Sequence, residues 1–365
     1  MNKILQPPAK LTLTAFALLT IAVAGTSFPA PELKGIRAWI NSEPLTIKEL
    51  RGKVVLVDFW TYSCVNCIRT FPYLREWNAK YADDGLVIIG VHTPEFEFEK
   101  VYSNVLKATQ DNGITWPVAQ DNDFKTWDNY SNRFWPAKYL IDKDGVVRYT
   151  HFGEGAYDET EVRIRDLLLD AGATLSEGPF EASGDQPLDQ TFIETRRGSV
   201  TWEFYAGFVL AELGGYVRQS DFFKNTGSVV DLESPDDLKS GVIYFDGQWV
   251  VWPEHTRHGR DTNGYEDVLS LVYSSRSLNA VVSSESGQPY TVGITLNGDF
   301  LIDENKGSDV TIAANGESFL SFNEPRMYSI IEAPAYSEDN KLTMSSNSDD
   351  FEIFAFTFGV YETGP

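Results

Sequence analysis

The chain has 365 residues, a length that accommodates two ordinary domains. Hydrophobic residues make up 42% of it and aromatic residues 13%, which is typical of a globular protein. The 53 acidic residues exceed the 30 basic ones and give a formal net charge of −23. Because this charge repels phosphate backbones and anionic lipid surfaces, we expect no nucleic-acid partner.

The first thirty residues have the pattern of an export signal. Two lysines precede an uncharged stretch that begins at Leu11, and the small residues AVA at 22–24 offer a cleavage site. We therefore expect residues 1–30 to be a secretory signal peptide and the protein to lie outside the cytoplasm, in the periplasm or secreted. An uncleaved membrane anchor is the alternative, because no charge follows Leu11 before Glu32.

Residues 36–173 alternate apolar runs with amphipathic stretches, a rhythm typical of a sheet covered by helices. The predicted elements are, in chain order, a strand at 54–60, a helix at 64–81, a strand at 86–91, a helix at 98–112 and a hairpin of strands 138–141 and 146–149. The turn signal DG at 144–145 predicts the hairpin. Asp158 and Glu161 have the spacing of a capping box and predict a last helix that ends near residue 172.

The chain changes character after this helix. Residues 176–190 are rich in Gly, Pro, Ser, Asp and Glu, a composition typical of a linker. Short runs rich in Val, Ile, Tyr, Phe and Thr follow, and several alternate, which predicts a β-sandwich. The predicted strands are 241–245, 248–252, 268–273, 290–296, 318–322, 327–331 and 351–358. Turn signals DG at 246–247 and NG at 297–298 separate neighbouring strands.

Aromatic residues of the second half allow two interpretations. Trp202, Trp249 and Trp252 could form a platform that stacks on sugars. Aromatic residues in alternating strands more often belong to a core, and we favour that interpretation. His255 and His258 lie in a polar segment and are expected in a loop.

The chain has two cysteines, Cys64 and Cys67, and they form one Cys-x-x-Cys motif. An exported protein that keeps only these two is not built on a disulfide scaffold, so we expect a chemical role for the pair. An inert structural disulfide and a zinc half-site are the alternatives, although only four histidines at irregular spacing could complete a zinc site. With only two cysteines, the chain cannot hold an iron–sulfur cluster through four cysteine ligands.

Cys64 follows a predicted buried strand and begins a predicted helix. Its sulfur should lie beside unpaired backbone N–H groups at the positive end of the helix dipole, which stabilise a thiolate. A thiolate is the attacking species in disulfide exchange, so Cys64 is the expected nucleophile. Cys67, one turn further along the helix, is expected to resolve the mixed disulfide.

Three further residues suit this chemistry. Asp58 lies in the apolar strand before the motif, where burial raises a carboxyl pKa, so it could take the proton of Cys67 or be an ordinary core carboxylate. The Trp135–Pro136 bond precedes a predicted strand and, if cis, would place a backbone edge beside the sulfurs for substrate docking. Glu95 follows a central strand and could modulate the sulfurs or be a solvated carboxylate.

These motifs resemble those of a known family. They are, in chain order, VDFW at 57–60, CVNC at 64–67, Pro72, VHTPEF at 91–96, the Pro136 turn, FGEG at 152–155, EPRMY at 324–328 and FAFTFG at 354–359. VDFW, CVNC and the two prolines resemble a thioredoxin domain. VHTPEF and FGEG resemble the extracytoplasmic TlpA-like domain of DipZ-type proteins, and the last two motifs resemble the β-rich C-terminal domain of the same family.

The resemblance implies an α/β thioredoxin fold at 31–175, a linker at 176–199 and an all-β, carbohydrate-binding-module-like sandwich at 200–365. It implies thiol:disulfide exchange on exported proteins without a bound cofactor or metal, in the direction of a reductase recharged by a CcdA-like membrane electron donor. The C-terminal domain would take a carbohydrate or a protein ligand. One departure is Ser63, where thioredoxins commonly have Trp.

Two other functions stay open. Thr61 precedes Cys64 by three residues, which matches half of the Pro-x-x-x-Thr-x-x-Cys pattern of peroxiredoxins. Val57 stands where the proline of that pattern would be, so a thiol peroxidase with antioxidant activity is the runner-up. The other is a binding protein that acts through its β-sandwich and uses the thioredoxin domain as a scaffold.

Overall fold

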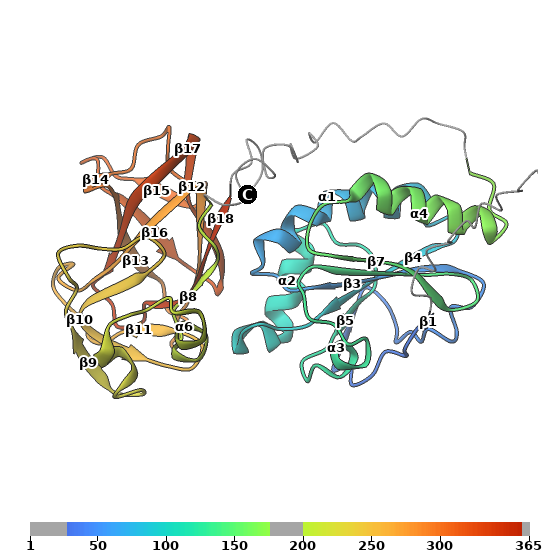
Figure 1. The fold of residues 1–365 in the computed structure, drawn as a ribbon, viewed down its shortest axis with the longest axis horizontal. Helices are drawn as coiled ribbons and strands as arrows, with labels where there is room; N and C mark the ends of the chain where they lie inside the picture. The colour runs from blue at the N-terminus through green and yellow to red at the C-terminus, as the bar shows by residue number, and fades with distance from the viewer. Residues whose placement is uncertain (1–27, 176–199, 360–365) are drawn as a thin grey trace, which may run out of the picture.

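The computed structural model describes residues 28–175 and 200–359, which form an N-terminal and a C-terminal unit (Figure 1). The predicted linker and residues 1–27 of the predicted signal peptide lie outside the described residues. Within the two described stretches, no helix is both long enough and apolar enough to cross a membrane.

A mixed seven-stranded sheet forms the middle layer of the N-terminal unit, in the order β1-β7-β6-β3-β4-β5-β2. Its strands are β1 (Phe28–Pro29), β2 (Trp39–Ile40), β3 (Val54–Trp60), β4 (Leu86–His92), β5 (Val118–Gln120), β6 (Ala137–Ile141) and β7 (Val146–Phe152). β3 runs parallel to β4 and β4 to β5, whereas β6 and β7 form an antiparallel hairpin. The two predicted strands and the predicted hairpin are confirmed.

Helices cover both faces of this sheet. α1 (Val65–Tyr81), α2 (Tyr102–Asp111) and α4 (Tyr157–Asp170) share one apolar core with the sheet. α3 (Lys125–Asn129) packs on the opposite face, where a second core lies (Figure 1). The resulting three layers are the thioredoxin-like arrangement that the sequence predicted.

The predicted helix at 98–112 is shorter than expected. Its first part is a 3₁₀ turn, η1 (Glu97–Lys100), and α2 begins only at Tyr102. Val101 separates the two because its backbone is extended, with φ −76° and ψ 118°.

The predicted capping box of the last helix is wrong. Ala156 occupies the N-cap of α4 with φ 49° and makes no side-chain cap, so Asp158 lies inside the first turn. Glu161 does not close a box but accepts hydrogen bonds from Trp77 Nε1 (3.0 Å) and Tyr81 Oη (2.5 Å) of α1. A buried carboxylate thereby joins α4 to the helix that begins at the Cys-x-x-Cys motif.

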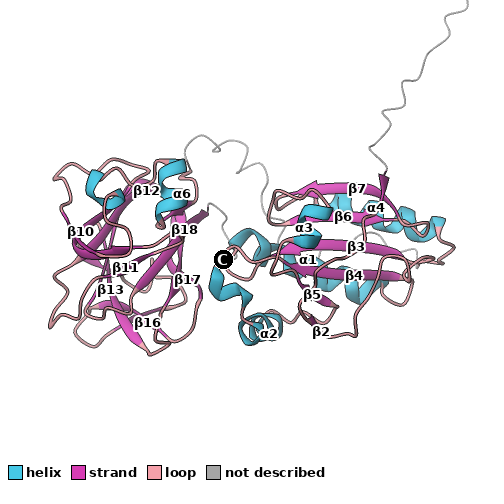
Figure 2. Ribbon diagram, turned by 90° about the horizontal axis from the view of Figure 1, so that it is seen from below, coloured by secondary structure: helices cyan, strands magenta, loops and turns pink. Residues whose placement is uncertain are grey.

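The C-terminal unit is a sheet of eleven antiparallel strands (Figure 2), with α6 (Phe208–Gly214) and a 3₁₀ turn, η2 (Ser220–Phe223), beside it. The strands are β8 (Phe204–Tyr205), β9 (Val229–Leu232), β10 (Ile243–Val251), β11 (Thr256–His258), β12 (Val268–Ser283), β13 (Tyr290–Leu296), β14 (Asp299–Phe300), β15 (Val310–Ile312), β16 (Ser318–Phe322), β17 (Arg326–Ser346) and β18 (Glu352–Gly359). β12 pairs with both β10 and β18, and β11 joins these two, so the strands enclose one apolar core. The all-β class is confirmed.

The predicted turn at 246–247 is wrong, because β10 continues through it. The first half of β10 pairs with β12 and the second half with β9, so the strand changes partners at Gly247. Gly247 has φ 90°, and a Cβ there would lie 1.9 Å from Oδ1 of Asp267. The turn signal therefore marks a bend inside one strand. The second predicted turn, at 297–298, does join β13 to β14.

The aromatic and histidine residues of the C-terminal unit divide between core and surface. Trp249 is buried in the core, as we favoured, whereas Trp202 is 78% exposed. The loop expected for His258 is wrong, because this residue ends β11 and is fully buried. It contacts a carboxylate oxygen of Asp267 at 2.9 Å, which explains its burial.

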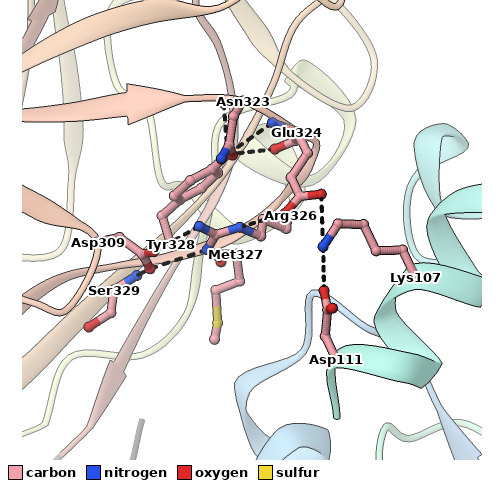
Figure 3. Close-up of polar contacts among 9 residues, drawn as sticks. All are labelled: Lys107, Asp111, Asp309, Asn323, Glu324, Arg326, Met327, Tyr328 and Ser329. Carbon is pink, nitrogen blue, oxygen red and sulfur yellow. Dashed lines mark hydrogen bonds and ion pairs between the residues drawn. The ribbon is translucent and has the colours of Figure 1, made fainter. Parts of the chain in front are cut away.

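The two units meet through a mixed apolar and polar contact. Phe354 of β18 packs edge-on against Phe96 and Phe98, with ring centroids 5.1 and 4.9 Å apart. At the border, Lys107 of α2 lies between Asp111 of its own helix (2.6 Å) and Glu324 of the C-terminal unit (3.4 Å) (Figure 3). The segment between β4 and α2 is thus held against the C-terminal unit.

Candidate redox site

Cys64 and Cys67 lie where the sequence predicts them, at the N-terminus of α1. Cys64 is the N-cap, and its Sγ accepts a hydrogen bond from the backbone N–H of Cys67 at 3.3 Å. Cys67 is fully buried and Cys64 is partly exposed, and both are free thiols. Of the two sulfurs, that of Cys64 is therefore the more accessible to solvent.

Several groups around Cys64 oppose the acidity expected for it. They raise the pKa of its thiol through the hydrogen bond with the Cys67 side chain, through burial, and through electrostatic repulsion from Cys67, Glu203 and Glu95. The helix N-terminus acts in the opposite direction, because it favours a thiolate.

Asp58 lies on the Cys67 face of the sheet, paired with a lysine. Alternate residues of β3 and Cys67 belong to the same core, and Asp58 continues that alternation. Lys138 of β6 is the residue paired with Asp58 of β3 in the sheet. Its Nζ lies 3.1 Å from Asp58 Oδ1, and both side chains are only 1% exposed. Burial raises the pKa of Asp58, and the charge of Lys138 opposes that rise.

The Pro136 turn directly precedes β6. The Trp135–Pro136 peptide bond is cis. Trp135 Nε1 donates to the backbone oxygen of Thr93 at 3.0 Å, and the backbone N–H of Gly153 donates to Pro136 O at 2.8 Å. These bonds fix the turn between the loop after β4 and the end of β7.

Glu99 was missed by the sequence reasoning, yet it is the buried centre of the loop beside the cysteines. Its carboxylate accepts hydrogen bonds from Ser63 Oγ (2.6 Å) and from the backbone N–H of Phe96 (3.0 Å). It also accepts from the backbone N–H groups of Ser63 and Glu95. Ser63, which stands where thioredoxins commonly have Trp, thus donates to Glu99. Because Ser63 directly precedes Cys64, this bond ties the start of the motif to the loop that carries Glu95.

Glu95 is joined to the residue before Cys64 through Glu99, which accepts from the backbone N–H groups of both Glu95 and Ser63. The Oε1 of Glu95 lies 2.7 Å from the hydroxyl of Tyr205, a residue of β8 in the C-terminal unit. The site is therefore built from both units, which the sequence did not predict.

Sequence signals for the missed residues differ in strength. Lys138 is the one charge in an otherwise apolar strand, so the cost of burying it could have marked it. Glu99 resembles any charge of a short helical turn, and Tyr205 lies more than a hundred residues from Cys64 along the chain. Neither residue lies in a local sequence pattern that would have predicted its position in the site.

No metal centre accompanies these residues. Within 28–175 and 200–359, no group of three or more His, Cys, Asp or Glu side chains is arranged to hold a metal ion. His92 is buried beside Trp60 and Tyr62, and burial lowers its pKa to about 3, so its imidazole is neutral.

Known proteins resemble both units of the chain. Residues 24–150 match the AhpC/TSA family, and residues 189–359 match the thioredoxin-like C-terminal domain family. The thiol-disulfide oxidoreductase YkuV of Bacillus subtilis is 33% identical over 143 residues, which cover 39% of this chain and 95% of that protein. The chain belongs to the thiol-disulfide oxidoreductases.

Two further relatives of this thiol-disulfide oxidoreductase extend the match. The thiol-disulfide oxidoreductase ResA of Bacillus cereus is 31% identical over 128 residues, which cover 35% of this chain and 71% of that protein. The protein DipZ of Mycobacterium tuberculosis is 39% identical over 279 residues, or 73% of this chain. The oxidoreductase spans only 38% of the length of DipZ, so the resemblance to a DipZ-type protein is confirmed for that part alone.

Proposed function

We propose that this oxidoreductase reduces disulfides of exported proteins through Cys64 and Cys67. The observation that carries the proposal is the partly exposed Cys64 at the N-cap of α1, with the buried Cys67 thiol one turn behind it. Because a mixed disulfide at Cys64 would keep its sulfur beside Cys67, the two thiols can act in sequence.

The proposed reaction transfers two electrons from the two cysteine thiols to the substrate disulfide. The Cys64 thiolate attacks a substrate disulfide, forms a mixed disulfide and releases the first substrate thiolate. Cys67 gives its proton to Asp58 and attacks the Cys64 sulfur, which releases the second substrate sulfur as a thiolate and leaves a Cys64–Cys67 disulfide. The departing thiolate then takes the proton from Asp58 and leaves as a thiol. The burial of Asp58 beside Lys138 supports this role, because burial raises the pKa of its carboxyl group and makes it a better proton acceptor. Pro136 presents its backbone edge to the substrate.

We propose that electrons flow from Cys64 and Cys67 to the substrate. Oxidoreductases whose reduced form is stabilised, as by a very acidic thiol, act as oxidants. The raised pKa of Cys64 withholds that stabilisation and favours transfer of electrons to the substrate. A reductase needs a dithiol donor, for which we propose a CcdA-like membrane protein.

Export and the second ligand are parts of the same proposal. The charged lysines and apolar run of residues 1–30 support export or anchoring outside the cytoplasm. A carbohydrate or a protein segment is the proposed ligand of the C-terminal unit, and the exposed Trp202 supports a contact there.

A trapping experiment tests the proposed function. In a Cys67→Ser variant the mixed disulfide at Cys64 cannot be resolved, so the protein should accumulate covalent complexes in its own compartment. Non-reducing electrophoresis and mass spectrometry would detect and identify them. We expect exported proteins with disulfides among the partners.

The matched control is the Cys64→Ser, Cys67→Ser double variant, which lacks the attacking sulfur and should trap nothing. Equal complexes in both variants, or no complexes in the single variant, would contradict the proposal. Rapid peroxide consumption that depends on Cys64, without any insulin reduction, would favour the peroxidase alternative instead.

A further inference from the structure

A tyrosine of the C-terminal unit lies between two carboxyl groups at the redox site. The hydroxyl oxygen of Tyr205 is 2.7 Å from Glu95 Oε1 and 2.9 Å from Glu203 Oε2. Both distances are those of normal hydrogen bonds between oxygen atoms.

A count of hydrogens points to an extra proton in this group. A phenol has one hydrogen to donate, and an ionised carboxylate has none. Both short contacts are attractive only if one carboxyl is protonated and donates to the phenol oxygen, while the phenol donates to the other. Glu95 is half-buried and Glu203 is exposed, and burial favours the neutral form, so the proton belongs on Glu95.

The surroundings keep this proton in place. The acidic groups that act on Glu95, besides Glu203, are Glu99 of η1 and Glu254 of the C-terminal unit. The loop of Glu95 is held against the residue before Cys64, because Glu99 accepts from the backbone N–H groups of Glu95 and Ser63, and both bridged carboxyl groups raise the pKa of Cys64. Negative charge therefore disfavours ionisation of both Glu95 and Cys64.

Packing holds the bridge against the cysteines. Tyr205 pairs with Ala355 across β18, and its ring contacts Phe96 with centroids 6.5 Å apart. Phe96 is the neighbour of Glu95 and is buried in the apolar contact between the units. The position of the phenol therefore depends on the docked C-terminal unit.

We propose that the C-terminal unit completes the redox site, because Tyr205 and Glu203 are positioning residues that bridge to Glu95 and share one proton beside Cys64. The carboxyl pair then carries a single negative charge, which sets how readily the Cys64 thiol ionises. This inference rests on the proposed function, since it concerns the regulation of the same nucleophile.

A shared proton has a consequence that independent carboxylates lack. When Glu203 becomes glutamine, Glu95 can ionise in its place, so the charge beside Cys64 stays the same. When Glu95 becomes glutamine, the amide donates to the phenol as the protonated carboxyl did. Only the loss of both carboxyl groups removes the charge.

The test measures alkylation of Cys64 by iodoacetamide against pH in the full reduced chain, with peptide mapping to assign the modified cysteine. We expect Glu95→Gln and Glu203→Gln each to change the rate at pH 7 by less than about twofold. The double variant should react about tenfold faster, which corresponds to a Cys64 pKa lower by one unit. Glu212→Gln, an exposed carboxylate of the same unit, is the control and should change nothing.

Two results would overturn the inference. Single variants that each accelerate alkylation and add up in the double variant would show independent carboxylates, and an unchanged double variant would show that the pair does not act on Cys64. In a Tyr205→Phe background, which keeps the ring but removes the hydroxyl, the two single effects should become additive. Alkylation needs no disulfide exchange, so a chain that shows this pattern without reducing insulin would contradict the proposed function alone.

Discussion

Replacing Cys64 by serine should reduce the rate of insulin reduction by about 10³-fold or more, the range that loss of a nucleophile costs other enzymes. A hydroxyl at the N-cap of α1 can still accept the hydrogen bond from Cys67 N–H, so the helix should form as before. It cannot form a mixed disulfide, so both later steps are lost. Precipitation of the insulin B chain in the presence of dithiothreitol measures the rate.

The control for this variant is its stability. Urea unfolding of the Cys64→Ser protein should give a free energy of unfolding within about 1 kcal/mol of the parent, because the side chains are close in size. Insulin reduction that survives the substitution would contradict the assignment of Cys64 as the nucleophile. A variant that fails to fold would be recognised by its urea transition.

Local patterns were sufficient to predict the frame of the site. The apolar run of β3 followed by Cys64 at a helix start, and the turn of the β6–β7 hairpin, each depend on a few neighbouring residues. The cis bond before Pro136 was left open by the sequence, because a proline permits a cis bond and does not require one. The local patterns place the two sulfurs on the fold.

The acidity of Cys64 could not be predicted in the same way. The helix N-terminus is a local signal, whereas Glu203 acts from the other side of the linker and reaches the sulfur only after the two units pack together. The turn signal at 246–247 failed for a similar reason. Its glycine bends a strand to make room for Asp267, a contact that only the folded sheet defines.

The second prediction with a large expected effect concerns the buried pair of Asp58 and Lys138. A Lys138→Met variant should lose about 3–5 kcal/mol of unfolding free energy, because it leaves a carboxyl group without its charge partner in the core. Lys138 is also the group that opposes the raised pKa of Asp58. Its loss should keep Asp58 protonated at neutral pH, so Cys67 loses its proton acceptor and resolution slows by about 10²-fold.

Resolution can be followed separately from stability. Cys64 is converted to its mixed disulfide with thionitrobenzoate, and release of the coloured thiol reports the attack by Cys67. An Asp58→Leu, Lys138→Met double variant is the matched control, because it removes both charges and replaces them with apolar volume. It should recover most of the lost unfolding free energy, since apolar replacements of buried ion pairs are often neutral or stabilising.

The double variant separates the two roles of the pair. If Asp58 accepts the proton of Cys67, resolution stays slow although the fold is stable again, because the leucine cannot take a proton. If the pair only supports the core, resolution recovers together with the unfolding free energy, and the proton-transfer role of Asp58 is contradicted. If Asp58 does accept the proton, raising the pH should speed resolution in the double variant. A Cys67 thiolate formed by hydroxide no longer needs the carboxylate.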